Sequence, residues 1–91
     1  MEELKRFLVN FEIIDNKERY QYADSSEEAF AESEEEAVEL VRQWVIDTCA
    51  QDGYTIDLEN VGSVDGIRII GDEYLNDIDV EYRYFRVVER N

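Results

Sequence analysis

The chain opens with a pattern in which apolar and polar residues alternate. In residues 5–14 every second residue is apolar, and successive side chains of a strand point to opposite faces, so one face of this segment is predicted to be buried. The apolar positions are Phe7, Val9, Phe11 and Ile13. Residues 15–18 favour a turn, and residues 19–23, with Tyr20 and Tyr22 on one side, predict a second strand that completes a hairpin.

Polar residues predict that the second strand stops early. Asp24, Ser25 and Ser26 are turn-favouring residues and are expected to break it. Residues 28–31 then resume an extended pattern for a short stretch before the next element.

A helix is predicted after Ser33, which is a good N-cap, with Glu36 at the capping-box spacing. The positive end of the helix dipole stabilises glutamates in the first turn. The helix should end near residues 50–51, with Asp52-Gly53 as its exit. Trp44 is predicted to lie in the core, as part of an apolar stripe at helical spacing that comprises Ala37, Leu40, Val41, Trp44, Val45 and Thr48.

Three further extended segments follow the helix. Residues 54–59 alternate, residues 67–70 form a short apolar run after a turn, and residues 77–89 predict the longest strand. The period of that last segment shifts near residues 85–88, where a bulge is expected. The sequence therefore predicts one α+β domain over residues 1–91: a mostly antiparallel sheet of four to five strands with one helix on one face, in the order β-β-α-β-β-β.

The composition excludes much of ordinary catalysis. The chain has no histidine, which removes the usual general base near neutral pH and a common zinc ligand. Cys49 is the only cysteine, so no internal disulfide forms, and this fits a reducing compartment. No apolar run has the length of a membrane span, and the N-terminus does not resemble a signal peptide. We expect a cytoplasmic, non-enzymatic protein with no catalytic residues, no cofactor and no bound metal.

The net charge of −15 is unevenly distributed along the chain. Residues 20–82 contain 18 acidic and two basic residues, whereas residues 1–19 and 83–91 together contain six acidic and seven basic residues. If the first and last strands are neighbours, one region is nearly neutral and another strongly negative. Such a surface disfavours nucleic acid and anionic membranes and favours a basic protein partner.

The last long strand is predicted to carry a row of carboxylates. Asp77, Asp79 and Glu81 alternate with its apolar face and would recur at about 6.6 Å, a spacing comparable to that of backbone phosphates. Tyr54 and Tyr74 adjoin turns and are candidate exposed contacts. The residues predicted to bind the partner are Glu32, Glu34, Glu35, Glu39, Asp57, Glu59, Asp72, Glu73, Tyr74, Asp77, Asp79 and Glu81.

In size, acidity and lack of catalytic residues, the chain resembles small phage-encoded DNA mimics, among them many anti-CRISPR proteins, and some immunity proteins of nuclease toxins. The resemblance covers the whole chain and rests on composition, without a shared sequence motif. It implies an inhibitor that occupies the nucleic-acid-binding site of a basic effector or nuclease, in the host cytoplasm if the gene is phage-encoded.

Other interpretations of the same residues stay open. The glutamates around Ser33 also suit a solvated helix start. The acidity also suits a homodimerising or other assembly domain that uses charge for solubility, or a protein from a high-salt cytoplasm. A carboxylate-metal hydrolase is a further alternative, although no calcium-loop spacing is present.

Overall fold

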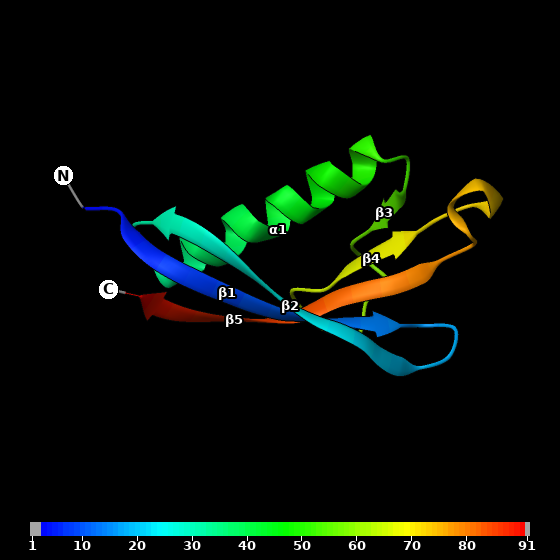
Figure 1. Ribbon diagram of the computed structural model, residues 1–91, viewed down its shortest axis with the longest axis horizontal. Helices are drawn as coiled ribbons and strands as arrows, with labels where there is room; N and C mark the ends of the chain where they lie inside the picture. The colour runs from blue at the N-terminus through cyan, green and yellow to red at the C-terminus, as the bar shows by residue number, and fades with distance from the viewer. Residues whose placement is uncertain (1–2, 91) are drawn as a thin grey trace.

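The computed structural model describes residues 3–90, without the side chains of residues 20–22, and it confirms the predicted α+β class. One helix packs on one face of a five-stranded antiparallel sheet, in the predicted element order (Figure 1). The proposed common face of Tyr20 and Tyr22 lies outside the described side chains. No helix within residues 3–90 combines the length and the apolar character that crossing a membrane requires.

The first and last strands are neighbours in the middle of the sheet. The spatial order is β2-β1-β5-β4-β3, and every neighbouring pair is antiparallel. The strands are β1 (Lys5–Asp15), β2 (Tyr20–Ala31), β3 (Thr55–Asp57), β4 (Ile67–Ile70) and β5 (Asp79–Arg90); the helices are α1 (Glu34–Gln51) and a short 3₁₀ helix, η1 (Glu73–Leu75).

The core lies between α1 and the sheet. The predicted inward face of β1 is confirmed, because Phe7, Val9 and Phe11 are buried. From α1 the buried residues are Ala37, Val41 and Val45, and from β4 they are Ile67 and Ile69. Burial of these side chains, at about 1.5–3 kcal/mol each, is the main force that holds helix and sheet together.

The prediction that Trp44 lies in the core is wrong. The buried row Ala37-Val41-Val45 has apolar neighbours on both sides, and only one side packs against the sheet. Val38, Ile46 and Cys49 occupy that side, whereas Leu40 and Trp44 are 47% and 52% exposed. Periodicity alone does not show which way such a helix is turned.

β2 is one unbroken strand, so the predicted break at residues 24–26 is wrong. Asp24, Ser25 and Ser26 pair in register with Glu12, Phe11 and Asn10 of β1. The Ser26 hydroxyl also hydrogen-bonds the Asn10 side chain at 2.5 Å. β2 is an edge strand, where polar residues are tolerated, and the long ladder with β1 overrides their weak strand propensity.

The predicted irregularity of the last strand is confirmed at Tyr84–Phe85. Tyr84 has a φ of 60°, and the register with β1 shifts between Asn10 and Glu12. This bulge turns Phe85 into the core, where its ring stacks on Phe11 with centroids 5.1 Å apart.

The helix ends are also confirmed. The Ser33 hydroxyl accepts a hydrogen bond from the Glu36 amide at 3.2 Å, and Asp52 is the C-cap. Gly53 follows with a φ of 94°, a conformation that favours glycine at this position. β4 has the predicted bounds, whereas β3 is shorter than predicted and β5 begins only at Asp79.

Candidate functional site

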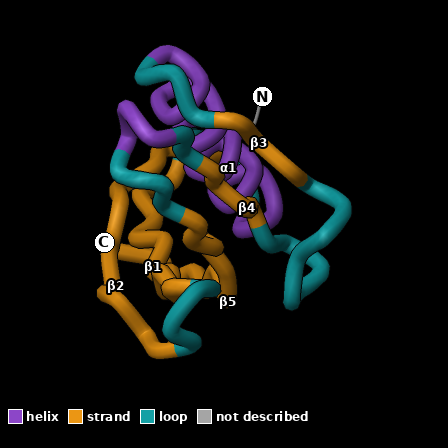
Figure 2. The backbone as a smooth tube through the Cα atoms, turned by 90° about the vertical axis from the view of Figure 1, so that its right-hand side faces the viewer, coloured by secondary structure: helices purple, strands orange, loops and turns teal. Residues whose placement is uncertain are grey.

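The sheet has one face under α1 and one face without a helix, which we call the open face (Figure 2). Strand alternation and register place Arg6 of β1 and Arg83, Arg86 and Arg90 of β5 on the open face. By the same register Arg68 of β4 shares this face, so five of the nine basic residues lie there. The acidic residues on the same face are Glu12, Asp24, Glu28, Asp57, Asp79 and Glu81. The open face is therefore nearly neutral. The sequence predicted such a region if the first and last strands were neighbours, and β1 and β5 are neighbours.

The start of α1 carries a dense run of exposed glutamates. We call Glu32, Glu34, Glu35, Glu36 and Glu39 the helix-start cluster; all five are exposed. Glu39 pairs with Arg42 at 3.1 Å, and within residues 3–90 no cation forms an ion pair with the other four. Helix positions three or four apart have Cβ atoms about 5–6 Å from each other, so Glu39 is a near neighbour of Glu35 and Glu36, while Glu34 begins the helix and Glu32 precedes its N-cap.

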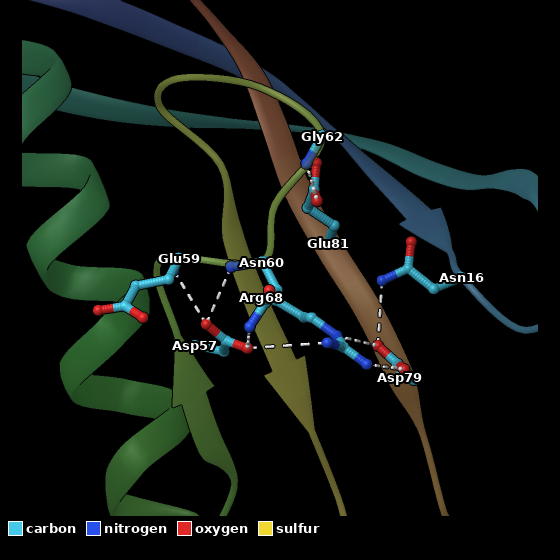
Figure 3. Close-up of polar contacts among 8 residues, drawn as sticks. All are labelled: Asn16, Asp57, Glu59, Asn60, Gly62, Arg68, Asp79 and Glu81. Atoms are coloured by element: carbon cyan, nitrogen blue, oxygen red, sulfur yellow. Dashed lines mark hydrogen bonds and ion pairs between the residues drawn. The ribbon is translucent and has the colours of Figure 1, made fainter.

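The predicted row of carboxylates on the last strand is only partly present: Asp79 and Glu81 share one face of β5, but Asp77 lies outside the strand, and the fold engages both of the others. Asp77 precedes β5, with a φ of 50° in the turn after η1. Asp79 accepts two hydrogen bonds from Arg68 of β4, from Nε at 2.9 Å and from Nη2 at 2.6 Å, and a third from Asn16 at 3.0 Å. Figure 3 shows Arg68 between Asp79 and Asp57, whose carboxylate lies 3.7 Å from the guanidinium.

Asp57 is held by its own loop as well. Its carboxylate accepts hydrogen bonds from the Asn60 side chain at 3.0 Å and from the amides of Glu59 and Asn60. The Asn60 side chain, followed by these amides and then Arg68, lowers the pKa of the Asp57 carboxyl. The Asp57 carboxylate is therefore engaged by its own loop and by Arg68, whereas the Glu59 side chain is exposed.

Glu81 is buried, with 3% of its surface exposed. It accepts a hydrogen bond from the Gly62 amide at 2.6 Å and lies 3.5 Å from the Arg83 guanidinium (Figure 3). An added Cβ at Gly62 would lie 2.5 Å from Arg83 Nη1, so glycine allows this close approach. Glu81 anchors the loop between β3 and β4 and is not available to a partner.

Arg68 also couples stability to pH. Its hydrogen bonds are the main cause that holds the pKa of the Asp79 carboxyl below its usual range. The folded chain then binds fewer protons at Asp79 than the unfolded chain, so the pair stabilises the fold above about pH 4 and loses its effect as pH falls through the lower folded value.

Replacing Arg68 by methionine should therefore destabilise the protein by about 1–2 kcal/mol at neutral pH, through loss of the bidentate pair with Asp79. Urea unfolding of both proteins from neutral pH to about pH 3 checks this, because the difference should shrink below about pH 4. An equal difference at every pH would show that the ion pair with Asp79 is not its cause.

A second acidic region lies at the tip formed by the turn around η1. The Asp72 carboxylate caps the Tyr74 amide at 3.0 Å, and Glu73 and Asp77 are exposed. Tyr74 is 86% exposed, in agreement with the prediction, whereas Tyr54 is partly buried against the core. Figure 1 places η1 and the start of α1 at opposite ends of the molecule, so the predicted residues do not form one surface.

A groove between α1 and β2 is lined by residues that were not among the predicted partner contacts. It has a volume of about 230 Å³ and is lined by Glu27, Glu28, Ala29, Leu40, Val41 and Trp44. Within residues 3–90 no three His, Cys, Asp or Glu side chains form a group able to hold a metal ion. The nearest candidates, Asp57 and Asp79, already surround a guanidinium.

Cys49 is partly buried late in α1, as predicted. Burial, followed by the negative charge of Asp52, raises the pKa of its thiol. Only the thiolate reacts with alkylating agents, so Cys49 should react with iodoacetamide more slowly at neutral pH than a free cysteine. Mass spectrometry of timed samples checks this; a rate equal to that of free cysteine would contradict the assigned environment.

Comparisons with models of known families, with curated proteins and with solved structures found no match to this chain, so its geometry and charge are what a functional proposal has to rest on.

Proposed function

We propose that this chain is a non-enzymatic binding protein that docks an acidic surface on the basic, nucleic-acid-binding site of a partner protein and excludes the nucleic acid. The observation that carries the proposal is the helix-start cluster, five exposed glutamates of which only Glu39 has an ion-pair partner in residues 3–90. The most concrete version is a phage anti-defence protein of the anti-CRISPR kind, active in the host cytoplasm.

The fold concentrates the negative charge in a way that supports this role. The arginines of the open face lie on the side of the sheet away from α1, so they do not neutralise the helix-start cluster. The positive end of the helix dipole stabilises acids in the first turn, which lets the fold tolerate their mutual repulsion. Uncompensated surface charge of one sign speeds association with an oppositely charged site.

The proposal is tested by displacement of labelled DNA or guide RNA from nucleases and CRISPR effector complexes. The pair Glu34→Gln/Glu35→Gln removes two charges from the helix start, and the matched pair Glu73→Gln/Asp77→Asn removes two from the tip. The helix-start pair should weaken displacement roughly three- to tenfold at low salt, with little change for the tip pair. Displacement unaffected by salt, or weakened only by the tip pair, would contradict the proposal.

Self-association through the open face is a second candidate. Leu8 and Val88 lie directly opposite each other there, with Phe30 nearby on β2, and Val88 and Phe30 are about half exposed. This face is the nearly neutral part of a chain that otherwise repels its own copies.

Sedimentation velocity separates this candidate from the first. If the open face forms a dimer, Val88→Glu should dissociate it, whereas Leu58→Glu, at a similarly exposed position in the loop after β3, should not. A monomer over the whole accessible concentration range would remove self-association as the function.

A further inference from the structure

β2 offers a long strand edge to which another chain can add. It lies at one margin of the sheet (Figure 2) and pairs only with β1. Over the described residues no strand lies against its outer edge, although β2 runs for 12 residues. Half of the amides and carbonyls of such an edge point away from the sheet, which makes the edge a template for an added strand.

An apolar groove lies beside this edge. Leu40 and Trp44 of α1 form one wall and Ala29 of β2 contributes to the other. A half-exposed tryptophan next to a leucine on a very acidic surface is unfavourable in water, and such pairs are typical anchor points in protein interfaces. A strand that paired with β2 would run along the groove and could place one side chain in it.

The charges beside the groove select the occupant. Glu27 and Glu28 line it; the Glu28 carboxylate already pairs with Arg6 of β1, whereas within residues 3–90 no cation forms an ion pair with Glu27. A second copy of β2 would bring like charges together across the new pairing, which is destabilising. A cationic strand would instead meet opposite charges. Of the other edges unpaired among the described residues, β3 is only three residues long, and β5 beyond Tyr82 carries Arg86 and Arg90 and would repel such a segment.

We infer that an extended, basic segment of the partner adds to the outer edge of β2 as a further strand, with an apolar side chain in the groove of Leu40 and Trp44 and a cationic side chain near Glu27, which lies on the same side of β2. This inference rests on the proposed function, since it describes how the basic partner is held. The backbone pairing gives affinity, the groove gives register and the carboxylates give selectivity for cations.

Trp44 is the only tryptophan and reports on the groove directly. The probe is a synthetic peptide of about eight residues built from lysine–lysine–valine–valine repeats, a length typical of a paired strand. This order gives each face of the added strand both valine and lysine. Its binding should shift the Trp44 emission to shorter wavelength and slow amide exchange in β2. A peptide of the same sequence with alternate amides N-methylated keeps the charge and loses the hydrogen bonds, and it should bind at least about tenfold more weakly.

Two variants locate the binding. Leu40→Lys should weaken the lysine–valine peptide about tenfold, and Leu58→Lys, at an equally exposed leucine in the loop after β3, should leave it unchanged. Equal binding of the N-methylated peptide, protection of β5 in place of β2, or no saturation of the Trp44 signal at about 1 mM peptide would overturn the inference.

The two proposals fail in different ways. If a nuclease is displaced from DNA by the wild-type protein and equally by Leu40→Lys, the strand addition is overturned and the acidic-surface proposal stands. If the peptide binds as described and no nuclease or effector releases its nucleic acid, the proposed function is overturned, and only peptide binding by β2 is left.

Discussion

Replacing Glu81 with alanine should destabilise the protein by about 2–4 kcal/mol, although the residue belongs to the acidic set expected from the sequence to face a partner. Glu81 is 3% exposed and holds the Gly62 amide at 2.6 Å, with the Arg83 guanidinium 3.5 Å away. Without the carboxylate, a loop amide and a largely buried guanidinium lose their partner. Urea unfolding at neutral pH measures the change.

The matched control for Glu81 is Glu59→Ala. Glu59 belongs to the same predicted set, but its side chain is exposed and makes no hydrogen bond or ion pair in the described structure. Its loss should change the free energy of unfolding by no more than about 0.5 kcal/mol. Equal small effects at both positions would show that Glu81 is not an internal anchor and would restore it to the exposed acidic surface.

Phe11→Ala should destabilise the protein by about 3–5 kcal/mol, the largest effect expected here. Phe11 is 3% exposed and lies opposite the bulge in β5, where its ring stacks on both Phe85 and Tyr82, with centroids 5.1 and 5.5 Å away. Truncation leaves a cavity at the register shift between β1 and β5. Thermal or urea unfolding measures the change.

Phe30→Ala removes the same ring from a position that is 55% exposed on β2. It should cost less than about 1 kcal/mol, because little buried apolar surface is lost. If Phe11→Ala cost no more than Phe30→Ala, the side chains around the bulge would not form the packed core described above.

The sequence predicted the elements whose signals are local. Ser33, Glu36 and Asp52-Gly53 mark the two ends of α1, and they do so through contacts within one or two turns. Alternation likewise predicted the inward face of β1, and the shift of period predicted the bulge of β5. Each of these patterns depends on backbone geometry that a short stretch of chain contains.

The errors concern contacts between segments that are distant in sequence. Residues 24–26 favour a turn, yet pairing with β1 keeps them in a strand. Trp44 fits an apolar stripe, yet the packing of the opposite flank of α1 leaves it half exposed. Asp79 appears free in sequence until β4 places Arg68 beside it. From composition alone the Asp79 carboxylate is expected to be free on the surface, whereas in the fold it is paired with Arg68.

Carboxylates that are paired inside the fold cannot bind a partner, so the candidate site contains fewer residues than predicted. Asp57, Asp79 and Glu81 are engaged within the sheet and its loops, and the tip around Tyr74 lies at the far end of the molecule. The helix-start cluster, of which Glu36 was not among the predicted contacts, keeps its charge exposed. The local clustering of these acids around one helix end favours a binding role over acidity spread evenly for solubility.

The central claim is that the carboxylates at the start of α1 create a field that a cationic protein recognises. An NMR titration with an oligolysine of about ten residues at low ionic strength tests it without knowledge of the partner, because screening by salt should abolish a purely electrostatic contact. The largest amide shifts should fall in residues 32–39 and disappear when salt is added. Shifts spread evenly over the acidic residues of the whole surface, or centred on the tip around η1, would contradict the claim.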